Sequence, residues 1–226
     1  MKEEYLSPSA FKFAYQESSY KWLSEEYEEL AALAQHYGLP TRMLDWTTSL
    51  FTALYFASSG ALRNWDNEIY DDSDKMVIWV LDGGYIHNIT KDVDIRTIKN
   101  NKIKHIKTKG IPLKIVVPPY YDNPNLNAQK GVMSYWEIEM PCRKDEGHIP
   151  IDRRPLDELL KGHDLGYESD HRDILYKFVL SINECGHMYS VVNDLGYNAA
   201  KLFPGYDGVA KKIAEDDIMR RFLGIG

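Results

Sequence analysis

Residues 35–57, QHYGLPTRMLDWTTSLFTALYFA, form the stretch of this sequence that says most about its fold. A short bend rich in polar and charged side chains lies there between two apolar segments. Residues 24–37 carry apolar side chains at the 3–4 residue spacing of an amphipathic helix. Residues 48–59 are apolar almost all round, which predicts a buried helix. Residues 41–47, between them, are predicted to be extended.

The ends of both helices can be predicted from single residues. Ser24 is expected to cap the first helix, since serine accepts backbone N–H groups of a first turn. Gly38 stands where a left-handed residue ends a helix, and Pro40 follows it. Thr47 or Thr48 is the expected cap of the second helix.

The rest of the chain alternates irregularly between strand and helix signals, which favours an α+β fold. Strands are predicted at residues 75–81, 113–117, 132–140 and within 173–182, and helices at 183–195 and 206–223. Loops are predicted at 60–74 and 118–130, with mostly irregular chain at 141–172. With no low-complexity linker, we expect one domain over residues 1–226, a mixed central β-sheet with flanking helices.

Composition excludes several classes of protein. Apolar residues make up 44% and charged residues 27%, a globular balance. The two cysteines cannot form a disulfide framework, and no apolar run approaches the ~20 residues needed to cross a bilayer. No signal-peptide pattern opens the sequence, so we expect a cytoplasmic protein without a membrane partner. The net charge of −7 argues against a phosphate-binding surface over the whole protein.

Polar side chains crowd the bend between the two apolar helices. Charged groups beside buried elements must either form ion pairs or bind a ligand or substrate, because an unpaired buried charge is costly. One interpretation is structural: Arg42 and Asp45 form a pair and Trp46 anchors the turn. The other is a binding or catalytic site at this bend.

Residues 34–57 resemble the signature of the FRG domain family, QHxGxPTRLLDWTxSxxxALYFA, with Met43 in place of a leucine. Residues 127–136, NAQKGVMSYW, are similar to the family's second motif, in which Gln129 holds the glutamine position. Residues 194–213 resemble its closing segment, so the resemblance covers about 25–213. The family's upstream Phe/Tyr-Arg-Gly motif is absent from this chain, which means either that it precedes residue 1 or that it is lost.

The resemblance implies an ADP-ribosyltransferase-like order of motifs and NAD as substrate. Cleavage of the nicotinamide–ribose bond passes through an oxocarbenium-like centre, which needs donors for the pyrophosphate, aromatic groups and a carboxylate or amide near the ribose. The expected catalytic residues are Arg42, Asp45, Gln129 and Glu137, with Glu139 as an alternative. The expected cofactor-binding residues are His36, Thr41, Trp46, Thr47, Ser49 and Tyr55.

The leading functional hypothesis is a bacterial ADP-ribosyltransferase-like protein, acting as a toxin with an antitoxin partner or as a phage-defence effector. The alternative is a non-catalytic FRG module that serves as a scaffold. A metal hydrolase using histidines and aspartates within residues 163–173 is a weaker hypothesis, because the spacing matches no zinc site, and no metal is expected. Cys185 and His187 lie on different faces of one predicted helix, which makes them a poor nucleophile–base pair.

Residues 91–114 form a basic loop or hairpin, with eight Lys or Arg against two Asp. Such lysines commonly protect a strand edge from pairing. The alternative is a landing site for nucleic acid or another acidic partner. Its contacts would come from Lys99, Lys102, Lys104, Lys107 and Lys109.

Overall fold

A computed structural model describes most of the chain as two compact units. The described residues are 20–69, 71–84, 93–99, 102–108, 110–118, 120, 123–140, 154–161 and 174–225. The first unit contains Met1–Met43, Thr90–Lys114 and Tyr135–Gly166, and the second contains Leu44–Ile89, Ile115–Ser134 and Tyr167–Gly226. Each unit is described by itself, and a single domain over the whole chain stays a prediction.

The first unit is built from short elements. In chain order these are β1 (Tyr20–Trp22), the 3-10 turn η2 (Glu25–Tyr27), α2 (Glu28–His36), β4 (Val93–Lys99), β5 (Lys102–Thr108), β8 (Ile138–Met140) and α6 (Leu156–Lys161). Strand β1 pairs antiparallel with β8, and β4 pairs antiparallel with β5. The basic segment therefore contains a hairpin.

Helix α2 begins and ends close to the predicted limits. The 3-10 turn η2 precedes it, and Ser24 holds the N-cap position of that turn as predicted, although its side chain makes no capping hydrogen bond. At the other end, Gly38 has φ +86, a left-handed conformation that glycine adopts without a Cβ clash. The N–H of Leu39 donates to the carbonyl of Ala34 at 3.0 Å and closes the turn.

The second unit contains the long helices. Its elements include β2 (Leu44–Thr47), α3 (Leu50–Asp66), β3 (Lys75–Leu81), α5 (Pro124–Gln129), β9 (Leu175–Ser181), the 3-10 turn η3 (Ile182–Glu184), α7 (Cys185–Asp194), α8 (Ala199–Leu202) and α9 (Tyr206–Leu223). Strands β3 and β9 form an antiparallel ribbon from Lys75 opposite Ser181 to Leu81 opposite Leu175. Strand β2 lies in a three-stranded sheet ordered β2, β7 (Gly131–Trp136), β6 (Leu113–Val116).

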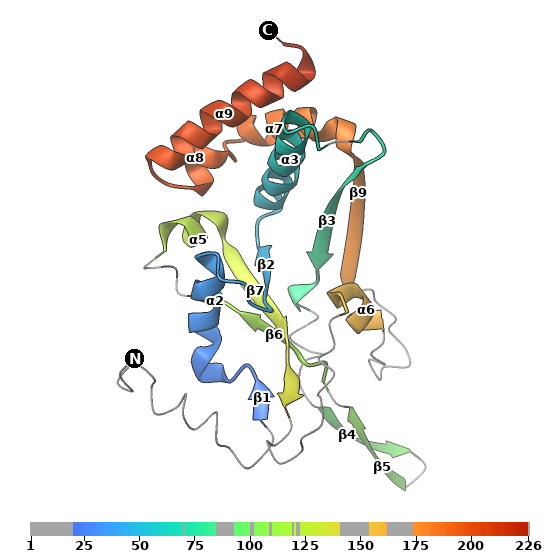
Figure 1. Cartoon of the computed structure of the whole chain (residues 1–226). Coiled ribbons are helices and arrows are strands. Elements are labelled where there is room, and N and C mark those ends of the chain that lie inside the picture. The colour runs from blue at the N-terminus through green and yellow to red at the C-terminus, as the bar shows by residue number, and fades with distance from the viewer. Residues whose placement is uncertain are drawn as a thin grey trace, which may run out of the picture. The chain divides into compact units, whose positions relative to one another are not determined.

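The main core of the second unit lies between its helices. Figure 1 shows α3 beside α7, with α8 and α9 next to them. The buried side chains of this core include Tyr55, Leu62, Cys185, Tyr189, Val192, Leu202 and Ile218. Helices α8 and α9 approach so closely that a Cβ on Gly208 would lie 1.9 Å from the carbonyl oxygen of Phe203. Glycine at this position therefore permits the close packing of the two helices.

Helix α3 differs from its prediction at both ends. Ser49 is its N-cap and accepts the N–H of Thr52, so neither Thr47 nor Thr48 holds that position. The helix continues to Asp66, where a loop was predicted, because buried Ser59 and Leu62 extend the buried stripe by another turn. The helix is also not buried on all sides as predicted, since Leu50 and Phe51 are exposed.

The strand predicted at 132–140 is interrupted. Glu137 separates β7 from β8, and its N–H donates to the carbonyl of Pro112 at 2.6 Å. The interruption lets the chain change partners, because β7 pairs with β2 whereas β8 pairs with β1. The alternation of side chains continues with the same period of two on both sides of Glu137, so the sequence pattern could not reveal the break.

The α+β class is confirmed, and the strands form small sheets with flanking helices. Two predicted irregular segments contain helices, α5 within 118–130 and α6 within 141–172. No helix in the described part of the chain is long and apolar enough to span a membrane.

Candidate functional site

The turn that leads into α3 is held by hydroxyl groups. The Oγ1 of Thr47 accepts the N–H of Ser49 at 3.1 Å, and the Oγ of Ser49 accepts the N–H of Thr52 at 3.4 Å. Thr52 is fully buried, and its own Oγ1 has no hydrogen-bond partner. The hydroxyl groups of Thr47 and Ser49 are thus used in hydrogen bonds that stabilise the start of α3.

Gln129 joins this turn to two other parts of the second unit. Its backbone carbonyl accepts the Oγ1–H of Thr47 at 2.7 Å. Its side-chain Nε2 donates to the carbonyl of Leu202 at 3.1 Å. The neighbouring Lys130, in the left-handed conformation with φ 49, accepts the N–H of Thr48 at 3.1 Å. Thr47, Gln129 and Leu202, from the sequence segments 35–57, 127–136 and 194–213, therefore meet at Gln129.

An aromatic surface with a lysine lies where the first and last of these segments meet. The rings of Phe51 on α3 and Tyr197 lie 5.1 Å apart. The Lys201 ammonium lies 3.7 Å from the centroid of the Tyr197 ring. Phe51 and Lys201 are exposed, and Tyr197 is half-buried. We call Phe51, Tyr197 and Lys201 the aromatic–lysine surface.

Three further predicted residues belong to the second unit. Trp46 is half-buried, and its Nε1–H donates to the buried Oγ of Ser134 on β7 at 2.8 Å, which anchors β2. Asp45 is exposed on β2. Tyr55 has no exposed surface and faces the helical core instead of solvent. A cofactor role for Tyr55 would therefore need a change in the packing of α3.

The remaining predicted residues belong to the first unit. His36 ends α2 and packs edge-to-face on Tyr37 at 5.6 Å. Thr41 donates to Gln35 and accepts the N–H of Met43, so it stabilises the turn. Arg42 is exposed. Glu137 forms an ion pair with Lys114 at 3.8 Å. The prediction that these residues share one concave site with Gln129 stays a prediction.

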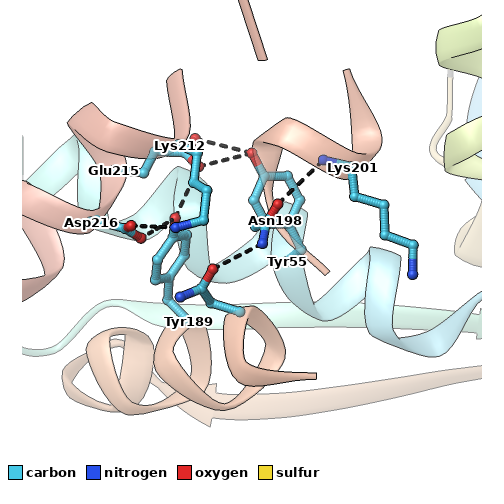
Figure 2. A network of polar contacts seen from close by, with 8 residues as sticks. Tyr55, Tyr189, Asn198, Lys201, Lys212, Glu215 and Asp216 are labelled. Carbon is cyan, nitrogen blue, oxygen red and sulfur yellow. Dashed lines mark hydrogen bonds and ion pairs between the residues drawn. The ribbon is translucent and has the colours of Figure 1, made fainter. Parts of the chain in front are cut away.

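A buried polar network is the feature that sequence reasoning missed. Figure 2 shows the Glu215 carboxylate of α9 facing the hydroxyl of Tyr55 on α3. The two carboxylate oxygens accept from this hydroxyl at 3.1 and 2.9 Å. The hydroxyl of Tyr189 on α7 lies 3.4 Å from Glu215 Oε2 and 3.3 Å from Asp216 Oδ1. Glu215 is only 2% exposed, so this carboxylate is part of the core.

The electrostatics of the network follow from its burial. Removal from water raises the pKa of the Glu215 carboxyl, against the opposing effects of the Tyr55 hydroxyl and the Lys211 ammonium. Burial also raises the pKa of both tyrosines, and the nearby Glu215 charge adds to the rise. Both tyrosines therefore remain hydrogen-bond donors at neutral pH. For Lys211, burial lowers the pKa although Glu215 opposes this.

The sequence of α9 shows which residues share a helical face with Glu215, but not that this face is buried. Gly208, Glu215 and Ile218 are the buried residues of this helix, and Lys211 lies four residues before Glu215. These intervals of three, four and seven residues define one helical face. An acidic residue on that face was the signal, but no motif drew attention to it.

The weaker sequence hypotheses gain little from the described residues. Burial raises the pKa of the Cys185 thiol to about 11, which keeps it in the poorly nucleophilic protonated form. No group of three or more potential metal ligands lies within the described part of the chain. The residues from His163 to Asp173 and the side chains of the basic hairpin fall outside the residues described.

Comparison with known proteins supports the family resemblance. A sequence model of the FRG domain matches residues 2–65. The matched residues include the signature, β2 and most of α3, so this part of the chain is similar to the FRG domain. No curated protein and no solved structure matches the chain. The match ends before Gln129 and Lys201, so the likeness of the two later segments to the family stays a prediction.

Proposed function

We propose that this chain binds a nucleotide-type ligand at the aromatic–lysine surface, with NAD as the substrate of an ADP-ribosyltransferase-like reaction. The observation that carries the proposal is the meeting of three segments at Gln129, because Thr47 and Leu202 both bond to this one residue. Residues far apart in the chain are brought together there beside exposed aromatic and cationic groups.

The surface offers the two kinds of contact that a dinucleotide needs. The exposed ring of Phe51 provides a face on which a base or nicotinamide ring can stack. Lys201, held over the Tyr197 ring, provides a positive charge for a pyrophosphate. The start of α3, capped by Ser49, adds the positive end of a helix dipole.

The proposed reaction transfers ADP-ribose to a nucleophile. The bond between nicotinamide nitrogen and ribose carbon breaks, and nicotinamide leaves with the electron pair. The acceptor hydroxyl, amine or water forms the new bond to that carbon and loses a proton. Gln129 is the residue of this unit that we place near the ribose, because its amide is held in position by Leu202. A role as toxin or phage-defence effector would follow from consumption of NAD or modification of a host target.

One observation favours the alternative of a non-catalytic module. The side chains of Thr47 and Gln129 are engaged with backbone, Tyr55 with Glu215, and Glu137 with Lys114. Such contacts hold a scaffold together whether or not chemistry occurs. Binding and turnover must therefore be measured separately.

Calorimetric titration with NAD, ADP-ribose and nicotinamide tests the proposal. We expect saturable binding of NAD and ADP-ribose, weakened about tenfold by Lys201→Ala through loss of a charge-assisted contact. Lys177→Ala is the matched control, because Lys177 lies over Trp79 at 5.2 Å on the β3–β9 ribbon of the same unit. Absence of binding by the folded wild-type protein would refute the nucleotide site. Binding without nicotinamide release would favour the non-catalytic module.

A further inference from the structure

The carboxylate of Glu215 connects three helices of the second unit. It lies on α9, and it accepts from Tyr55 of α3 at 2.9 Å and faces Tyr189 of α7 at 3.4 Å (Figure 2). All three side chains are buried. Tyr55 belongs to the second turn of the helix whose first turn carries Ser49 and Phe51, so a contact at Tyr55 constrains both.

The charged and titratable groups around Glu215 come from each of these helices. On α9, the Lys211 ammonium lowers the pKa of Glu215 and so stabilises its charge. Asp216 pairs with Lys212. On α3, the Arg63 guanidinium likewise lowers the pKa of Glu215. Its Nε donates to the carbonyl of Ser59 at 3.3 Å. The carboxylate is therefore surrounded by donors and cations, although burial opposes its charge.

The same network extends to the Gln129 contact. The Lys211 ammonium lies 3.9 Å from the centroid of the Phe203 ring, and this ring packs edge-to-face on Phe56 of α3 at 6.1 Å. Phe203 follows Leu202, whose carbonyl accepts the Gln129 side chain. Glu215 is thus linked to α3 directly through Tyr55, and to the Gln129 contact through Lys211 and α8.

Stability alone does not account for a carboxylate in this place. Removing a carboxylate from water is costly, and well-packed apolar side chains of similar volume often stabilise a core equally well or better. A carboxylate instead defines the positions of the two hydroxyls by directional hydrogen bonds. This directional requirement suits a helix whose first turn must be placed accurately.

We propose that Glu215 is a positioning residue, which holds α3 against α7 and α9 through Tyr55 and Tyr189 and thereby orients the aromatic–lysine surface toward its ligand. The identity of the ligand rests on the proposed function, whereas the positioning role rests on the hydrogen-bond geometry. Glu215 itself is buried and makes no contact with the ligand.

Four variants separate positioning from general stability. Glu215→Leu removes both acceptors at similar volume, and Tyr55→Phe removes only the hydroxyl. Glu215→Gln keeps a carbonyl acceptor and serves as the rescue variant. Asp217→Asn is the matched control, because Asp217 lies exposed on the same helix and pairs at 3.0 Å with Arg221, four residues further along it.

Binding of ADP-ribose is the first readout. We expect Glu215→Leu and Tyr55→Phe to weaken binding about tenfold or more, as small misplacements of binding groups do. Glu215→Gln should stay close to wild type in affinity but lose the change of affinity across the pH range in which Glu215 titrates. Wild-type affinity in a folded Glu215→Leu protein, or an unchanged pH profile in Glu215→Gln, would overturn the inference.

Amide hydrogen exchange in residues 50–56 is the second readout and needs no ligand. We expect exchange about tenfold faster in Glu215→Leu or, should that variant not fold, in Tyr55→Phe, with no change in Asp217→Asn, because local opening reflects local contacts. Unchanged exchange would overturn the positioning role. If the wild-type protein binds no nucleotide but exchange responds as expected, only the proposed function fails.

Discussion

Helix α3 carries two polar clusters whose environments differ sharply. At its first turn, Thr47 and Gln129 are half-buried and Ser49 is buried, and all three bond mainly to backbone groups. One turn further on, Tyr55 is sealed from water and bonds to the Glu215 carboxylate. The first cluster was conspicuous in the sequence and the second was not. The difference teaches that a dense motif marks where the chain converges, whereas the raised pKa values of Tyr55, Tyr189 and Glu215 arise where tertiary packing excludes water.

Removal of the buried carboxylate should have the largest effect on stability. Glu215→Ala leaves the Tyr55 and Tyr189 hydroxyls without their acceptor and opens a cavity, so we expect a loss of about 2–4 kcal/mol in the free energy of unfolding. Urea denaturation measures it. Asp217→Ala on the same helix is the control and should change stability by less than about 0.5 kcal/mol. Equal effects of the two substitutions would mean that the buried carboxylate contributes no more to stability than an exposed one.

Loss of the helix cap at the first turn of α3 should cost less. Ser49→Ala removes the acceptor for the Thr52 N–H, with an expected loss of about 1 kcal/mol, the usual value of an N-cap. Ser49→Asp supplies another capping oxygen and should retain most of the stability. Thermal unfolding of both variants provides the comparison. A Ser49→Ala protein as stable as wild type would show that Ser49 does not stabilise α3.

The pH dependence of stability, compared between wild type and Glu215→Gln, should report on the buried cluster. The folded-state pKa of Glu215 is raised above its ordinary value of 4.5. Its contribution to stability is therefore fully present below that value and is lost as pH rises through the folded-state pKa. Glu215→Gln cannot ionise, so the difference in unfolding free energy between wild type and this variant should become less favourable to wild type with rising pH. A constant difference between about pH 4 and pH 7.5 would contradict the direction of the shift.

Asp45 should matter least for stability. The sequence favours a pair with Arg42, and Asp45 lies exposed on β2, where water screens an ion pair. Asp45→Ala should therefore cost no more than about 1 kcal/mol, as for exposed charges generally. A loss comparable to that of Glu215→Ala, measured by the same urea denaturation, would place Asp45 in the structural core of the turn. Asp45→Asn, which keeps shape and removes charge, distinguishes the two contributions.

Local signals in the sequence were sufficient for much of the secondary structure. Lys75–Leu81 and Tyr206–Leu223 have the predicted limits, because an uninterrupted apolar run and a long helical pattern are strong signals. The end of α2 at Gly38 follows equally from local chemistry, since a left-handed residue is required there. The signature also lies where distant segments meet, because Thr47 bonds to the carbonyl of Gln129, 82 residues further along the chain.

Only the tertiary structure decided which polar groups are buried and what they contact. The break at Glu137 arises because the two halves of one alternating segment pair with different strands. Tyr55 looked like a ligand contact, and Glu215 lay in no motif. Each is buried because α3 and α9 pack together, which no local pattern encodes. Burial and hydrogen-bond partners depend on residues far apart in the chain, whereas periodicity and capping depend on neighbours, and this is the physical reason for the division.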